Sequence, residues 1–105
     1  MSLDRPPRLL ADVGGTNARF AWQDADGAPL RDVAMLACSA YATLADAMTH
    51  YLSGLGRCAP PWCAIGIANP ITGDQVKMTN NAWSFSISEL QRSLGFERLV
   101  VINDF

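Results

Sequence analysis

The sequence predicts an α/β domain built on a mixed sheet, with three antiparallel strands first and parallel strands joined by helices after them. Three observations lead to this prediction. Short apolar strands separated by polar turns open the chain, two helical segments follow, and two uninterrupted apolar strands alternate with those helices. Right-handed crossovers through the helices would lay the later strands parallel to the first strand.

Length and composition limit what such a domain can be. The chain has 105 residues, 50% apolar and 17% charged, a balance typical of one globular domain. A net charge of −2 gives no positive field for nucleic acid, so DNA binding is disfavoured. Without a membrane-length apolar run or a signal peptide, we expect a cytoplasmic protein with no membrane contact. The three cysteines lack zinc spacing and are expected to be reduced, partly buried thiols.

The first three strands are expected at residues 8–13, 18–22 and 32–37. Gly14-Gly-Thr-Asn17 joins the first two strands as a tight hairpin turn, and Asp24-Ala-Asp-Gly27 makes a polar turn before the third. Because both turns are short, neighbouring strands should pair antiparallel.

Two helices are expected. In residues 43–55 the apolar side chains recur at the spacing of one helix face. Residues 87–94 form the second helix, because Ser86 and Glu89 match a capping box at its start and Gly95 can end it in left-handed geometry.

The later strands are expected at residues 62–68 and 98–102, with a small hairpin around residues 75–78 between them. Both apolar runs are predicted to be buried strands, and the first has no charge on either side. Ligands of open α/β sheets gather beyond the carboxyl ends of such strands. Asp12 and Asp104 follow two of these strands and should therefore share one end of the sheet.

The turn after the first strand has the chemistry of an anion site. Gly14 and Gly15 have no Cβ, so their backbone amides can approach an anion closely, and the Thr16 hydroxyl adds a donor. The pattern is neither the Walker sequence nor the dinucleotide fingerprint. Asp12 could serve a magnesium ion bridged by water to phosphates, or could equally accept hydrogen bonds from its own turn amides.

Further polar residues follow the later strands. Asp104 could act as a general base on a substrate hydroxyl during phosphoryl transfer, or could cap a following helix. Asn80 and Asn81 stand near Trp83, a combination that suits sugar hydroxyls, although a polar turn explains them nearly as well. The Asn69-Pro70 bond fixes the shape of its loop, and the sequence leaves its isomer open.

Several of these segments together resemble the amino-terminal part of bacterial glucokinases, in the hexokinase, actin and Hsp70 superfamily with its ribonuclease H-like (actin-like ATPase) fold. The resemblance runs from Leu10 to Phe105. Its anchors are Leu10-Ala-Asp-Val-Gly-Gly-Thr-Asn-Ala-Arg-Phe20, Asn69-Pro-Ile-Thr-Gly-Asp74, Met78-Thr-Asn-Asn-Ala-Trp-Ser-Phe-Ser86, Leu94-Gly-Phe96 and Val101-Ile-Asn-Asp-Phe105. Asp-x-Gly-Gly-Thr alone would mark only the broader superfamily.

The resemblance implies ATP-dependent phosphorylation of glucose at its 6-hydroxyl, with ATP and Mg²⁺ as cofactors. Asp104 matches the catalytic base, Asn103 matches a neighbouring sugar ligand, and Asn80 lies in a loop near the sugar cleft. Asp12 matches the carboxylate on the magnesium side, acting through water. The phosphate-binding segment is matched by Ala11, Asp12, Val13, Gly14, Gly15 and Thr16.

Family members continue into a second, larger domain that closes the cleft. Residues 1–105 match the smaller amino-terminal domain, so we expect this chain alone to be inactive or nearly so. The resemblance also allows a homodimer of the full-length protein. Two alternatives remain. The first is a sugar-sensing module of a kinase-like transcription regulator, although no recognition helix is present in these residues. The second is an ATPase or chaperone-like half-domain, which would not need Asn103 and Asp104.

Overall fold

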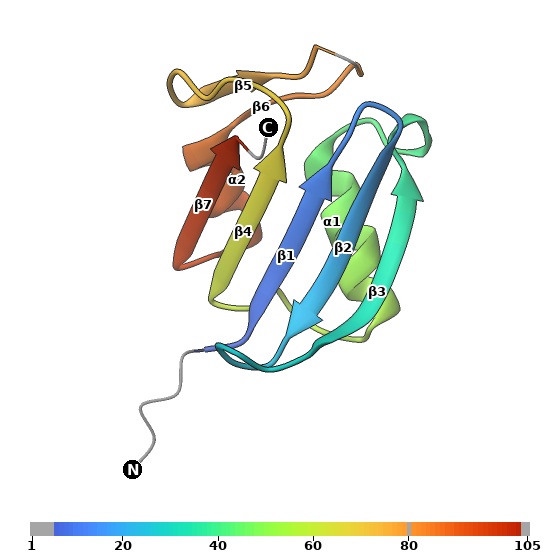
Figure 1. Ribbon diagram of the computed structural model, residues 1–105, viewed down its shortest axis with the longest axis vertical. Helices are drawn as coiled ribbons and strands as arrows, with labels where there is room; N and C mark the ends of the chain where they lie inside the picture. The colour runs from blue at the N-terminus through green and yellow to red at the C-terminus, as the bar shows by residue number, and fades with distance from the viewer. Residues whose placement is uncertain (1–5, 80, 104–105) are drawn as a thin grey trace.

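The computed structural model describes residues 6–79 and 81–103 of the chain. These residues form an α/β structure with a mixed sheet and two helices (Figure 1). The elements in chain order are β1 (Arg8–Val13), β2 (Asn17–Gln23), β3 (Leu30–Ala37), the 3-10 turn η1 (Cys38–Ala40), α1 (Leu44–Gly54), β4 (Trp62–Ile67), β5 (Gln75–Lys77), β6 (Ser84–Ser86), α2 (Ile87–Leu94) and β7 (Arg98–Asn103).

The main sheet has five strands in the order β3-β2-β1-β4-β7. β1 pairs antiparallel with β2, and β2 pairs antiparallel with β3. β4 pairs parallel with both β1 and β7. The predicted mixed sheet is therefore confirmed, with the observed strands matching the expected ones to within about two residues.

Both helices cover the same face of the sheet, behind it in Figure 1. The predicted apolar stripe of α1 is confirmed, because its buried residues recur every three or four positions: Leu44, Ala47, Met48, Tyr51 and Leu52. The Tyr51 hydroxyl also donates to the backbone oxygen of Asp32 at 2.8 Å, which ties the helix to β3.

The predicted ends of α2 are confirmed by its hydrogen bonds. The Ser86 hydroxyl accepts from the Glu89 amide at 3.2 Å, so it satisfies one of the unpaired donors of the first turn. Gly95 has φ +84°, the left-handed conformation that favours glycine at a helix end. Local sequence signals thus fix this helix at both ends.

The expectation that β4 and β7 are buried is right for only one of their faces. Cys63, Ile65 and Ile67 point into the helix layer and are at most 3% exposed. On the other face, Val100 is 44% and Ile102 is 52% exposed. Successive side chains of a strand point to opposite faces, and both helices lie on the same face, so the second face is open.

The structure also tests the expectations about the cysteines, the Asn69–Pro70 bond and membrane-spanning helices. Cys38 and Cys63 are buried, but Cys58 is exposed, so the prediction of three partly buried thiols is wrong for Cys58; all three are free. No peptide bond is cis within residues 6–79 and 81–103, so the Asn69–Pro70 bond is trans. Over the same residues, no helix is long and apolar enough to cross a membrane.

Candidate functional site

The carboxyl ends of β1, β4 and β7 meet at one edge of the sheet, the upper edge in Figure 1. Val13 pairs in register with Ile67, which pairs in register with Asn103. The glycine turn after β1 and the side chain of Asn103 therefore start from the same edge of the sheet, with the end of β4 between them. The predicted site residues Asp104 and Asn80 lie outside the residues that the structure describes.

The glycine turn is held by backbone hydrogen bonds on both of its arms. The Gly14 amide donates to the Asn17 oxygen at 2.9 Å, and the Cys38 amide donates to the Thr16 oxygen at 2.8 Å. Neither Gly14 nor Gly15 is among the residues with positive φ. A Cβ on Gly14 would lie 3.4 Å from the Asn17 oxygen, an ordinary contact. Glycine is therefore not required here by backbone strain, which leaves close approach of a ligand as its advantage.

The six predicted phosphate-binding residues contribute in two different ways. Ala11 and Val13 point into the core, at 8% and 1% exposure, so only their backbone is available. Asp12 lies on the open face and is exposed, in register with Arg19 of β2 and Gly66 of β4. Thr16 is exposed at the end of the turn. The side chains that could reach a ligand from this segment are those of Asp12 and Thr16.

The hairpin of β5 and β6, with the loops on either side of it, stands over the carboxyl edge (Figure 1). We call residues 69–86 the flap. Asn69 is 6% exposed and holds the start of the flap, because its Nδ2 donates to the Lys77 oxygen at 3.0 Å and its Oδ1 accepts from the Thr79 amide at 3.3 Å. Trp83 holds the other side by donating from Nε1 to the Tyr41 oxygen at 3.0 Å.

Asn81 lies in a turn held by its own side chain, which agrees with the polar turn that the sequence allowed as the alternative to a sugar contact. Its Nδ2 donates to the Gly14 oxygen at 3.1 Å, and its Oδ1 accepts from the Trp83 amide at 2.8 Å. Both ends of this amide are therefore engaged within the protein. Cys38 also approaches the glycine turn, with its Sγ 3.6 Å from the Gly14 oxygen. Burial raises the pKa of the Cys38 thiol, so the thiol keeps its proton and can donate it.

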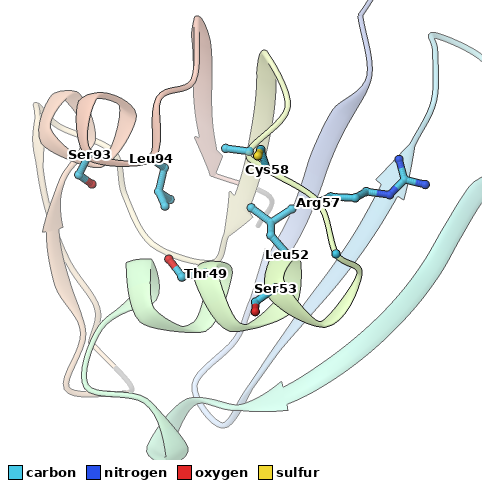
Figure 2. A pocket seen from close by; sticks show the side chains of 9 residues that line it. Thr49, Leu52, Ser53, Arg57, Cys58, Ser93 and Leu94 are labelled. Carbon is cyan, nitrogen blue, oxygen red and sulfur yellow. The ribbon is translucent and has the colours of Figure 1, made fainter.

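The two largest hollows of the described residues are each large enough for a small ligand. One of about 520 Å³ lies beside the glycine turn, between η1 and the flap, and is lined by Gly15, Thr16, Cys38, Tyr41, Asn81 and Trp83 among others. A larger one of about 600 Å³ lies in the helix layer, where Thr49 of α1 and Leu94 of α2 face it from opposite sides (Figure 2). We favour the first hollow as part of a site because it adjoins the carboxyl edge of the sheet. In the second hollow, the Arg57 side chain points away from the hollow, and its guanidinium carbon lies 4.2 Å from the centre of the Trp22 ring.

Metal ligands are sparse in the described part of the chain. Residues 6–79 and 81–103 contain no group of three or more His, Cys, Asp or Glu side chains that could hold a metal ion. Among the described residues, Asp12 is an acidic side chain next to the glycine turn. A cation at this edge would therefore need most of its ligands from water or from a bound anion, as magnesium usually does.

An open α/β sheet with a glycine turn at its carboxyl edge defines a domain that gathers ligands at that edge. Comparison with known proteins makes the assignment more specific. The family model described as Glucokinase matches residues 9–105, and the chain belongs to this family. It is 50% identical over 103 residues to a glucokinase of Aromatoleum aromaticum, a match that covers 97% of this chain and 31% of the relative.

Solved structures agree with this assignment. The crystal structure of a glucokinase from an Antarctic psychrotroph superimposes with a TM-score of 0.88 at 37% identity, over 96% of this chain and 33% of the other. A ROK family glucokinase from Streptomyces griseus, solved with glucose and AMPPNP, has the same fold, with a TM-score of 0.65 at 19% identity over 93% of this chain and 33% of the other. The chain thus spans about a third of the length of the glucokinases it matches.

Proposed function

We propose that this chain is the smaller, amino-terminal domain of an ATP-dependent glucokinase with the ribonuclease H-like (actin-like ATPase) fold. In this proposal residues 1–105 carry the phosphate-binding turn and the catalytic carboxylate, and a larger carboxy-terminal domain completes the cleft. One observation carries the proposal: the parallel strands β1, β4 and β7 bring the glycine turn and Asn103 to the same carboxyl edge of the sheet, with the end of β4 between them. Membership of the family supports it.

The proposed reaction transfers the γ-phosphoryl group of ATP to the 6-hydroxyl of glucose. Asp104 accepts the hydroxyl proton while the hydroxyl oxygen bonds to the γ-phosphorus, and the bond from phosphorus to the bridging oxygen breaks to release ADP. Asn103 and Asn80 hydrogen-bond the sugar and orient the reacting hydroxyl. The solved S. griseus glucokinase holds glucose and AMPPNP together, so this fold accommodates both kinds of ligand.

The nucleotide phosphates are proposed to lie against the turn formed by residues 11–16. Its backbone amides and the Thr16 hydroxyl donate hydrogen bonds to the phosphate oxygens, and its glycines let the backbone come close. These contacts cost little reorganisation because the turn is held on both arms, through Gly14 and through Thr16. The proposed role of the turn is to position the γ-phosphoryl group for attack.

The residues present fit a magnesium ion of the kind that accompanies ATP. Asp12 is an exposed carboxylate beside the turn, and magnesium prefers oxygen ligands while keeping several waters. We propose that Asp12 holds the ion through water. When bound, the ion neutralises charge that develops on the phosphate oxygens. Asp12 would hold a water of the ion by hydrogen bonding, and its carboxylate would attract the cation to the open face of β1.

The test is a comparison of two aspartates in the intact protein that contains this chain. A coupled assay should give a kcat for Asp104→Asn that is lower by about a thousandfold, with only a modest change in glucose affinity. The control is Asp26→Asn, the same change in the β2–β3 turn at the opposite end of the sheet, which should keep normal turnover. Near-normal turnover of Asp104→Asn would remove Asp104 from this role.

The regulatory alternative is not favoured, because the family model and the relatives from Aromatoleum aromaticum and Chromobacterium violaceum are named glucokinase, although other relatives are named bifunctional protein glk. The 105-residue chain by itself should form no measurable glucose 6-phosphate from glucose, ATP and magnesium, since it lacks the part of the cleft that the larger domain supplies. Brisk turnover by the isolated chain would contradict the proposed division into two domains.

A further inference from the structure

The carbonyl group of Gly14 is held from outside its own turn. It accepts a hydrogen bond from Asn81 Nδ2 at 3.1 Å and another from Cys38 Sγ at 3.6 Å. The first donor comes from the flap and the second from η1, directly after β3, so two segments far apart in sequence converge on one backbone oxygen.

The direction of that carbonyl decides where the next amide points. A trans peptide unit is planar, so the Gly14 oxygen and the Gly15 amide hydrogen point in opposite directions. The Gly15 hydrogen is therefore directed away from Asn81 and Cys38. Within the described residues, no backbone or side-chain acceptor is hydrogen-bonded to it. The amide is left available to an anion outside the turn, while the carbonyl, which would repel that anion, is turned away.

We propose that Asn81 is a positioning residue for nucleotide binding, which it serves by fixing the Gly14–Gly15 peptide so that the Gly15 amide faces the ATP phosphates. The proposal rests on the proposed function of the turn. Asn81 acts through the backbone and does not touch the nucleotide. The same peptide in the flipped orientation would present the Gly14 oxygen to the phosphates and weaken their binding.

Asn81 is well placed for this role because its own orientation is fixed. Its Oδ1 accepts from the Trp83 amide at 2.8 Å, which decides that the Nδ2 end faces Gly14. Trp83 is only 2% exposed and is anchored to the Tyr41 oxygen. The Cys38 thiol is a weaker donor at a longer distance, so it assists rather than replaces the amide.

The test exchanges the Asn81 amide for a carboxylate in the intact protein that contains this chain. Asn81→Asp keeps an oxygen for the Trp83 amide but puts an acceptor with a negative charge against the Gly14 oxygen, so the peptide should turn. We expect ATP affinity measured by titration calorimetry to fall about tenfold, the loss of roughly one hydrogen bond. The KM for ATP should rise in parallel, while the KM for glucose stays within about twofold.

The matched control is Gln75→Glu, the same amide-to-carboxylate change on an exposed side chain of the same flap, which should leave ATP affinity unchanged. Unchanged ATP affinity in Asn81→Asp, with wild-type protein that binds ATP, would overturn the role of Asn81 and leave the proposed function standing. Wild-type protein that binds no ATP would overturn the proposed function itself. If Asn81→Asp does not fold, Asn81→Ser, too short to reach the Gly14 oxygen, should weaken ATP binding in the same way.

Discussion

The two faces of the main sheet are built from the same strands but lie in opposite surroundings. On the covered face, Leu9, Phe20 and Ile65 are fully buried beneath α1 and α2. On the open face, five large apolar side chains are more than 40% exposed, namely Leu30, Val33, Met35, Val100 and Ile102, whereas Leu10 and Trp62 are half-buried. The sheet thus has a buried core on one face and exposed apolar side chains on the other.

This difference teaches that apolar strands do not by themselves make a buried sheet. Parallel strands of α/β proteins are usually apolar on both sides because helices cover both faces. Here both crossover helices, α1 and α2, lie on one face, so only that face gains from burial. Each large side chain fully buried there contributes about 1.5–3 kcal/mol, whereas an exposed one contributes much less.

The largest expected effect comes from making the same substitution on each face. Ile65→Ala removes a fully buried side chain of β4 and should lower the free energy of unfolding by about 2–5 kcal/mol. Ile102→Ala on the open face of β7, where the side chain is 52% exposed, should cost less than about 1 kcal/mol. Urea unfolding of the two variants measures the difference, and equal losses would mean that the open face is as well packed as the covered one.

Thiol labelling tests how tightly the covered face is closed without changing the core. Cys63 points into the covered face at 3% exposure, and burial raises the pKa of its thiol, so it should react with a disulfide reagent more than about a hundredfold slower than exposed Cys58. Cys58→Ser should abolish the fast phase, and Cys63→Ser should leave that phase intact. Fast labelling of Cys63 in the native protein would show that the helix layer opens readily.

The sequence could predict those features that depend on neighbours in the chain. The start of α2 follows from Ser86 and Glu89, its end from Gly95, and the hairpin of β1 and β2 from the short polar turn between apolar strands. In each case a few adjacent residues determine the backbone conformation. The position of the glycine turn at the carboxyl edge followed in turn from strand direction and crossover handedness.

Features that depend on distant contacts could not be predicted in this way. The sequence of β7 does not show that one of its faces is open, because the alternation of side chains does not reveal what packs against either face. The hydrogen bond from Asn81 to the Gly14 oxygen joins residues 67 positions apart, and it forms because the flap brings Asn81 next to the glycine turn. The roles of Asp104 and Asn80 stay predictions, since both residues lie outside the described part of the chain.

The smallest expected effect concerns how firmly α2 covers its face in acid. The Asp74 carboxylate accepts hydrogen bonds from the Ser86 hydroxyl, from the Ser88 amide at 2.8 Å and from the Ser88 hydroxyl at 3.0 Å. These hydrogen bonds hold the pKa of Asp74 below its usual value, and the bond from Ser86 has the largest effect. The carboxylate therefore stabilises the fold at any pH above its unfolded-state pKa, and this stabilisation is lost as the pH falls through the lower folded-state pKa.

Asp74→Asn removes this titration, so its free energy of unfolding should fall less than that of the wild type between about pH 5 and pH 2. Ser88→Ala removes one hydroxyl donor but leaves the amide, so its acid dependence should lie between the two. Urea unfolding at a series of pH values measures all three proteins. Parallel pH profiles for wild type and Asp74→Asn would mean that the charge of the Asp74 carboxylate does not stabilise the start of α2. The Asp74 carboxylate would then contribute nothing to the stability with which α2 covers the sheet.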